Sequence, residues 1–123
     1  MVEYNKAASP LSIKSYQFAI NIVNLIKNSQ NDWRIKSLFD QMLRSGTSIS
    51  ANIHESEFAQ SPADFVAKLS IYLKEANETV YWLQLLDDTN SINKESAQRY
   101  IKDCREIVAL LVASIKTAKA RMI

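Results

Sequence analysis

The sequence predicts an all-α protein, an antiparallel up-down four-helix bundle, and three observations lead to this prediction. The 123 residues include one glycine and two prolines, too few for the many tight turns of an all-β domain. Apolar residues recur at spacings of three and four over long stretches, which is the period of a helix packed on one side. Hydrophobic residues make up 47% of the chain and charged residues 23%, which is typical of one globular domain with a sizeable core.

Four helices are expected, at about residues 10–28, 33–59, 62–87 and 93–120 of a single domain, 1–123. Two of them begin with a serine N-cap followed by proline at the first helical position, at Ser9-Pro10 and at Ser61-Pro62. Polar runs at 28–32 and 87–91 separate the others. Connections as short as these favour antiparallel neighbours.

The helix at 93–120 has the most regular apolar seam, with alternating spacings of four and three. This is the heptad pattern of bundle packing, and its members are Ala97, Ile101, Cys104, Val108, Leu111, Ile115, Ala118 and Met122. The only cysteine falls on this seam, so we expect a small buried core residue rather than a reactive thiol. The helix at 62–87 has a comparable stripe of Phe65, Leu69, Tyr72, Ala76, Val80 and Leu83.

The helix at 10–28 has two apolar sides when it is projected at 100° per residue. One side carries Leu11, Phe18, Ile22 and Leu25, and the almost opposite side carries Ile13, Tyr16, Ile20 and Val23. A peripheral helix of a monomeric bundle needs one apolar stripe, and an uncovered second stripe usually marks an interface. Self-association is therefore expected, although the other three helices wrapping around this one would also account for the pattern.

The stretch RSGTSIS, residues 44–50, places weak helix formers inside the helix predicted at 33–59. Gly46 lies on the arc that faces the core, together with Ile35, Leu38, Met42, Ile49 and Ile53. Glycine costs about 1 kcal/mol relative to alanine inside a helix. We therefore expect close helix packing at Gly46.

Another face of the same helix carries a polar ladder: Arg44, Ser48, Asn52 and Glu55. The helix at 62–87 offers a matching second stripe in which two carboxylates lie between large apolar groups: Ile71, Glu75, Glu78 and Trp82. We expect Arg44 to bridge to Glu75 or Glu78, within one subunit or across subunits, as part of an assembly or polar network.

The segment at 41–86 resembles a known family through the words RSGTSI and KEANETVYWLQLL. The family is a group of bacterial four-helix bundles that includes proteins encoded within intervening sequences of 23S ribosomal RNA genes. Ser50 and Ser56 depart from its pattern, which has smaller residues there. The resemblance implies a homopentamer around a central channel. It also implies similarity to retroelement accessory proteins that bind nucleic acid beside a reverse transcriptase, although most members have no established activity.

The last helix is the basic part of the chain. Residues 1–90 carry 8 basic and 10 acidic side chains, and residues 91–123 carry 7 and 3. The candidate contacts to RNA or DNA are Lys94, Arg99, Lys102, Arg105, Lys116, Lys119 and Arg121. Cations near a helix C-terminus also have a local explanation, because they favour the helix dipole. The modest net charge of +2 leaves both interpretations open.

Catalysis, cofactors and metals are not expected, because no nucleophile, base and orienting group occur in a recognisable pattern. His54 with Glu55 and Glu57 invites comparison with carboxylate-bridged metal bundles, but the Glu-x-x-His motifs of those bundles are absent. The longest apolar run, 107–115, is too short to cross a membrane. With one cysteine and no signal-peptide pattern, the chain is expected to be cytoplasmic and to have no membrane partner.

Three large aromatic side chains, Trp33, Tyr81 and Trp82, lie away from the predicted core stripes. Such residues often anchor interfaces. Packing of the two tryptophans between identical subunits is the simpler interpretation. The alternative to nucleic-acid binding is a scaffold whose partner is another protein.

Overall fold

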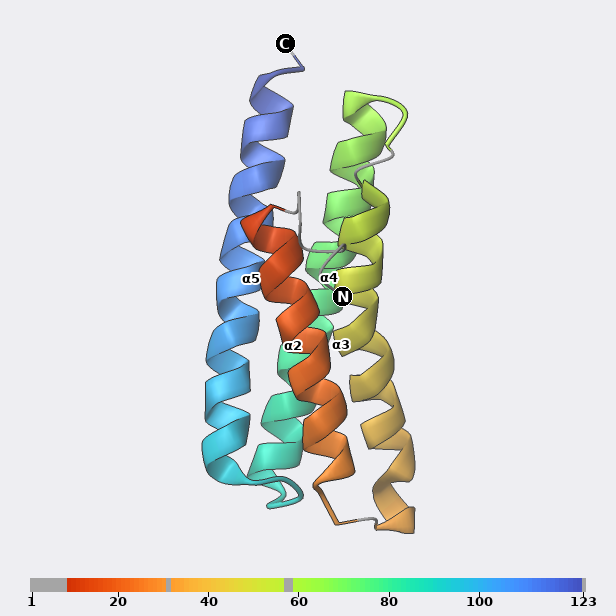
Figure 1. Ribbon diagram of the computed structural model, residues 1–123, viewed down its shortest axis with the longest axis vertical. Coiled ribbons are helices and arrows are strands. Elements are labelled where there is room, and N and C mark those ends of the chain that lie inside the picture. Colours follow the sequence, from red (N-terminus) through yellow and green to blue (C-terminus); the bar gives the residue numbers. More distant parts are fainter. Residues whose placement is uncertain (1–8, 31, 57–58, 123) are drawn as a thin grey trace.

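The computed structural model describes residues 9–30, 32–56 and 59–122. These described residues form four long helices: α2 (Pro10–Lys27), α3 (Lys36–Ser56), α4 (Pro62–Asp88) and α5 (Lys94–Ala120). A short 3₁₀ helix, η1 (Trp33–Ile35), precedes α3. Consecutive helices run in opposite directions (Figure 1). No strand occurs in the described ranges, and the prediction of an all-α four-helix bundle is confirmed.

The predicted helix boundaries agree with the structure to within a few residues, except around residue 33. There the chain forms η1 before the α-helix begins at Lys36, because the Asp32 carboxylate accepts a hydrogen bond from the backbone N–H of Arg34 and closes a tighter turn. The helix predicted to end at 59 is described as far as Ser56, and Ala59 is not helical. Residues 57 and 58 lie outside the described part of the chain.

The expected serine caps are confirmed. The Ser9 hydroxyl accepts a hydrogen bond from the backbone N–H of Ser12, and the Ser61 hydroxyl accepts one from the N–H of Asp64. Each serine satisfies one of the donors that the first turn of a helix leaves free. Asn93 caps α5 in the same way, through the N–H of Ser96.

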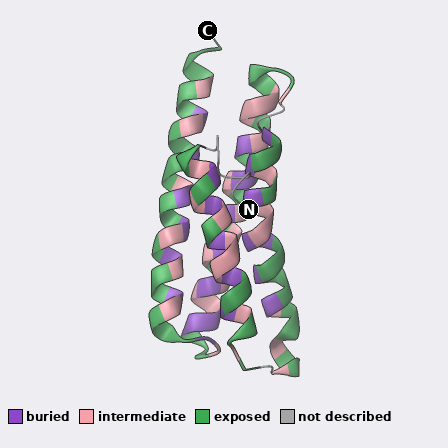
Figure 2. Cartoon of the chain, viewed as in Figure 1, coloured by how far each residue is buried: buried purple, intermediate pink, exposed green. Residues whose placement is uncertain are grey.

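The helices form a ring of neighbours, in which α2 and α4 each pack against both α3 and α5. Buried residues line the faces that point inward, and exposed residues cover the outside (Figure 2). α2 has 18 residues whereas α4 and α5 have 27 each. The start of α4 and the end of α5 therefore extend beyond the first turn of α2 (Figure 1).

The buried arc of α5 is wider than the predicted seam. Ile107 is fully buried although the heptad spacing selected Val108, which is only half-buried. On α4, Thr79 is buried and the predicted Val80 is half-buried. The reason is that each helix contacts two neighbours, which requires a broader apolar face than a two-position seam. Met122, also predicted on the seam, lies beyond the helix and is exposed.

The weak helix formers of α3 lie where α2, α3 and α4 approach one another. A Cβ atom added at Gly46 would lie 3.2 Å from Ile22 Cγ1 and 3.5 Å from Thr79 Cγ2. Beside Gly46, the buried hydroxyls of Thr79 and Ser45 form a hydrogen bond of 2.8 Å across the α3–α4 contact. Small side chains are therefore what this crossing accommodates.

Candidate nucleic-acid interface and assembly surfaces

A charged cluster on the outer side of α3 and α4 centres on Arg44. Its guanidinium contacts Glu75 Oε2 at 3.1 Å through Nη1 and contacts Glu78 Oε2 through Nη2. Both contacts lie within a single chain. One arginine thus bridges two carboxylates that sit one turn apart on α4, through charge-assisted hydrogen bonds.

The polar ladder does not continue along the whole of α3. The Ser48 hydroxyl reaches Glu75 Oε2 at 3.3 Å, but Asn52 and Glu55 make no side-chain hydrogen bond to any described residue. Asn52 and Glu55 lie on the last turns of α3, beyond the level at which α4 presents its two carboxylates. The cluster therefore consists of the first half of the ladder and α4.

Gln41 was not predicted as a member of this cluster, whereas Trp82 was. Gln41 Oε1 accepts a hydrogen bond of 3.1 Å from Arg44 Nε, one turn earlier on α3. The Trp82 indole N–H donates to Glu78 Oε2 at 3.0 Å, and the Tyr81 ring meets the Trp82 ring edge-on at 5.0 Å between centroids. The spacing of three between Gln41 and Arg44 is a signal that would have identified the first contact.

The two sides of α2 have different surroundings in the single chain. Phe18 and Ile22 on the inner side are buried. On the opposite side Ile13 is 44% exposed and Val23 is 38% exposed, and Ile20 between them is half-buried. The other three helices therefore leave part of this apolar side in contact with water, and we call it the outer face of α2: Ile13, Tyr16, Ile20 and Val23.

Trp33 is 84% exposed, although tryptophan is among the largest apolar side chains. The turn that carries it is held by Asp32, whose two carboxylate oxygens accept hydrogen bonds of 3.0 and 2.9 Å from the Arg34 side chain. Beside the indole lies a cavity of about 360 Å³ that Ile26 and Phe39 help to line. An exposed indole next to an apolar cavity has the chemistry of an interface anchor.

The predicted basic residues of α5 are all exposed, and they fall into two groups. Lys94, Arg105 and Lys116 recur every 11 residues, so they lie along one line of the helix, and Lys102 and Lys119 project within about 60° of it. We call these five the basic row. Arg99 and Arg121 project to the other side of α5.

Most of these cations have no carboxylate partner in the structure. Lys94 Nζ lies 3.5 Å from Asp87 Oδ2, which also accepts a hydrogen bond of 2.6 Å from Gln98. No described carboxylate lies within salt-bridge distance of the others, namely Arg99, Lys102, Arg105, Lys116, Lys119 and Arg121. Elsewhere in the described ranges, the only other lysines or arginines without a carboxylate within salt-bridge distance are Lys27 and Lys74.

Most cations outside α5 are paired with carboxylates, and several of these pairs lower the pKa of the acid. The hydrogen bond from Lys14 lowers the pKa of the Glu106 carboxyl and joins α2 to α5. The hydrogen bond from Lys68 lowers the pKa of Asp64, and the one from Arg34 lowers that of Asp32. Unpaired positive charge is therefore concentrated on the last helix.

Cys104 is a buried core residue, as predicted. Burial raises the pKa of its thiol to about 12, and the S–H group donates to the Ala76 carbonyl at 3.3 Å. In the described part of the chain, no three His, Cys, Asp or Glu side chains are grouped so that they could hold a metal ion. His54 and Glu55 are exposed, and Glu57 lies outside the described residues. None of the described helices combines the length and hydropathy that crossing a bilayer requires.

The fold and these surfaces define a small all-α bundle protein with one basic helix and one incompletely covered apolar helix. The chain belongs to the 23S rRNA-intervening sequence protein family, whose model matches residues 11–113. The resemblance expected from the sequence is therefore confirmed.

Comparison with solved structures leads to the same family. The crystal structure of a protein with unknown function from the S23 ribosomal protein family of Bacteroides thetaiotaomicron is 51% identical to this chain, with a TM-score of 0.81. The similarity covers 86% of this chain and 98% of that one. No curated protein matches the sequence. These comparisons establish the family and the fold and assign no reaction.

Proposed function

We propose that this protein is a non-catalytic, self-assembling bundle that binds RNA or DNA through the basic row of α5. The observation that carries the proposal is that all five cations of this row are exposed and that all except Lys94 have no carboxylate partner among the described residues. Lys94 to Lys119 spans 25 residues of helix, about 38 Å, and DNA carries one negative charge per roughly 1.7 Å of its axis. A row of this length can follow several phosphates.

Self-assembly would compensate for the small number of charges in one copy. Each chain has a net charge of +2, which is modest for a protein that binds by neutralising phosphates. Several copies joined through the outer face of α2 would present several basic rows to one strand and raise the affinity through avidity. We propose the homopentamer that the family resemblance implies, acting in the cytoplasm.

The test is the salt dependence of binding to a labelled RNA of mixed sequence. The variant Lys102→Gln, Arg105→Gln, Lys116→Gln, Lys119→Gln removes four cations of the row. Its plot of log affinity against log salt should be less steep than that of the wild type by up to about 3 for a single strand. Because all four side chains are exposed, the variant should keep its helical circular dichroism.

The matched control is Lys27→Gln with Lys74→Gln, which removes the two unpaired cations outside α5. It should leave the slope within about 1 of the wild type. Equal loss in both variants would mean that the position of the charges is irrelevant. Absence of RNA and DNA binding by the wild type at low salt would reject the proposal.

A second candidate is a scaffold for another protein, and the exposure of Trp33 beside its apolar cavity favours it. Purification from the native host distinguishes the two functions. A scaffold should bring down one protein in fixed proportion, and Trp33→Ala should release that protein. A nucleic-acid binder should bring down RNA or DNA, and the variant of the basic row should release it.

A further inference from the structure

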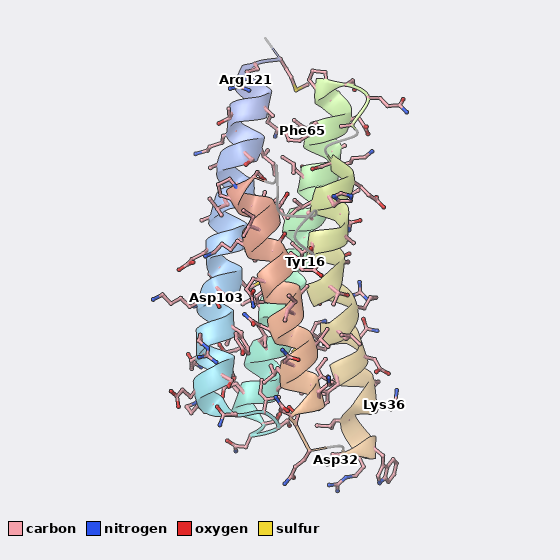
Figure 3. All side chains as sticks on the ribbon, in the orientation of Figure 1. Tyr16, Asp32, Lys36, Phe65, Asp103 and Arg121 are labelled. Carbon is pink, nitrogen blue, oxygen red and sulfur yellow. The ribbon has the colours of Figure 1, made fainter. Side chains whose placement is uncertain are left out.

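A polar cleft of about 540 Å³ lies at the end of the bundle where α2 turns into η1 and α4 turns into α5. Both connections are found at this end, close to Asp32 (Figures 1 and 3). Asn28 and Gln30 line the cleft from the first connection, Asn90 from the second, and Tyr100 from α5. The volume falls within the range of about 300–1,000 Å³ that is usual for small-ligand sites.

Four side-chain amides on the cleft are available to a ligand. Asn24, Asn28, Gln30 and Asn90 make no side-chain hydrogen bond to any described residue. Each amide offers a donor and an acceptor, which is the combination that the edges of nucleobases require. Asn90 is held toward this end by a tight turn, in which its φ is +56°.

Apolar and aromatic side chains also line the cleft, among several hydroxyl groups. Leu25 and Ile92 are buried side chains that line it, and Tyr100 adds a half-buried ring. A flat ring with polar edges is the ligand that such a surface fits, because its faces contact apolar and aromatic groups while its edges reach the amides. The single carboxylate among the lining residues, Asp32, already accepts hydrogen bonds from Arg34.

A positively charged side chain, Arg99, lies next to the cleft on α5. The Arg99 guanidinium lies 5.1 Å from the centre of the Tyr100 ring and donates a hydrogen bond of 3.3 Å to the Tyr100 hydroxyl. Arg99 has no carboxylate partner among the described residues, so its charge is available to a phosphate next to a bound base. Lys102, which belongs to the basic row, follows three residues later on the same helix.

We infer that this cleft holds one unstacked base of a single-stranded nucleic acid, with Arg99 bound to an adjacent phosphate. The inference rests on the proposed function and narrows it to single strands. A duplex keeps its bases stacked and paired, so it engages the basic row but not the cleft.

The experiment compares a labelled single-stranded RNA with a labelled duplex RNA of the same length, using fluorescence anisotropy at fixed salt. Tyr100→Ala should weaken single-strand binding at least fivefold, the effect usual for loss of a stacking aromatic. Asn24→Ala with Asn28→Ala should also weaken it about fivefold or more, because two hydrogen-bonding amides are lost. Duplex binding and the salt slope should stay unchanged. Tyr100→Phe keeps the ring and should bind the single strand nearly as the wild type does.

The matched control is Asn77→Ala, which removes an exposed amide from the outside of α4. It should bind both RNAs as the wild type does. Asn24 and Asn28 are exposed, so their replacement tests the cleft even if Tyr100→Ala reduces stability.

Two results would overturn the inference and leave the proposed function intact: unchanged single-strand binding in the cleft variants, or equal weakening for duplex and single strand. In both cases the variant of the basic row would still lose affinity. A wild-type protein that binds neither RNA would remove the inference and the proposed function together.

Discussion

At the scale of single residues, Gly46 decides how closely α2 can approach α3. Its position on the core-facing arc could be predicted from the apolar spacing around it. That Ile22 is the neighbour could not, because this contact joins residues 24 positions apart and depends on how the helices pack. The sequence thus predicts close packing at Gly46, and the structure identifies Ile22 as the residue packed against it.

Gly46→Ala should lower the free energy of unfolding by about 1 kcal/mol, because overpacking a buried contact outweighs the gain in helix propensity. The added methyl group would lie 3.2 and 3.3 Å from two branches of the fully buried Ile22, and no single rotation moves both away. Denaturant unfolding measures the change. The control is Ala51→Gly at an exposed position of α3, which reports the propensity difference alone. A Gly46→Ala protein more stable than the wild type would show that the contact is loose.

The contacts of Arg44 could also be predicted only in part from the sequence. The helical spacing aligned Arg44 with Glu75 and Glu78, and the structure brings the three together in one chain. Spacing alone did not indicate that Asn52 and Glu55 would stay outside the cluster. Their exclusion follows from where the two α4 carboxylates lie along the α3–α4 contact.

At the scale of helices, the Lys14–Glu106 salt bridge joins two neighbouring helices, α2 and α5. The hydrogen bond from Lys14 lowers the pKa of Glu106 in the folded chain. A lowered carboxyl pKa contributes stability that is present above the unfolded-state value and is lost as the pH falls through the folded-state value.

Glu106→Gln should therefore be slightly less stable than the wild type at pH 7, and the difference should vanish as the solution is acidified through the lowered folded-state pKa of Glu106. Thermal unfolding followed at several pH values measures this convergence. Asp32→Asn should show the same convergence, because the hydrogen bond from Arg34 lowers the pKa of Asp32 in the same way. A gap between wild type and Glu106→Gln that is constant with pH would contradict the assignment.

The two-sided character of α2 and the basic character of α5 were both predictable, since helical projection and charge counting need only the sequence. The Lys14–Glu106 contact was not, because it joins residues far apart in the sequence. The Arg34–Asp32 and Lys68–Asp64 pairs are local in sequence. Lys102 has the same i,i+4 spacing to Glu106 but forms no salt bridge with it, so spacing suggests pairs and the three-dimensional arrangement decides which of them form.

At the scale of the whole molecule, the outer face of α2 predicts the behaviour of the protein in solution. Scattered exposed apolar residues are normal on a protein surface. Four on one face of one helix, two of them exposed and two half-buried, form a surface suited to another copy of the chain.

Light scattering should find the wild type as an oligomer and the variant Ile13→Lys with Val23→Lys as a single-copy species. Both residues are exposed, so the variant should keep the helical circular dichroism of the wild type. Val112→Lys, at a comparably exposed apolar position on α5, should leave the oligomer intact. A wild type that remains a single copy at high protein concentration would end the self-assembly proposal.

The difference in length between α2 and its neighbours has a dynamic consequence. Where α4 begins and α5 ends, a cavity of about 430 Å³ lined by Phe65 and Leu110 lies beside the first turn of α2. The last two turns of α5 have fewer packed neighbours than its middle, so they should open without unfolding the rest. In native-state hydrogen exchange, amides at 113–119 should lose protection well before those at 100–107. The two ends of the bundle should therefore differ in how often their helices open. The end at the α4–α5 turn should stay closed for longer.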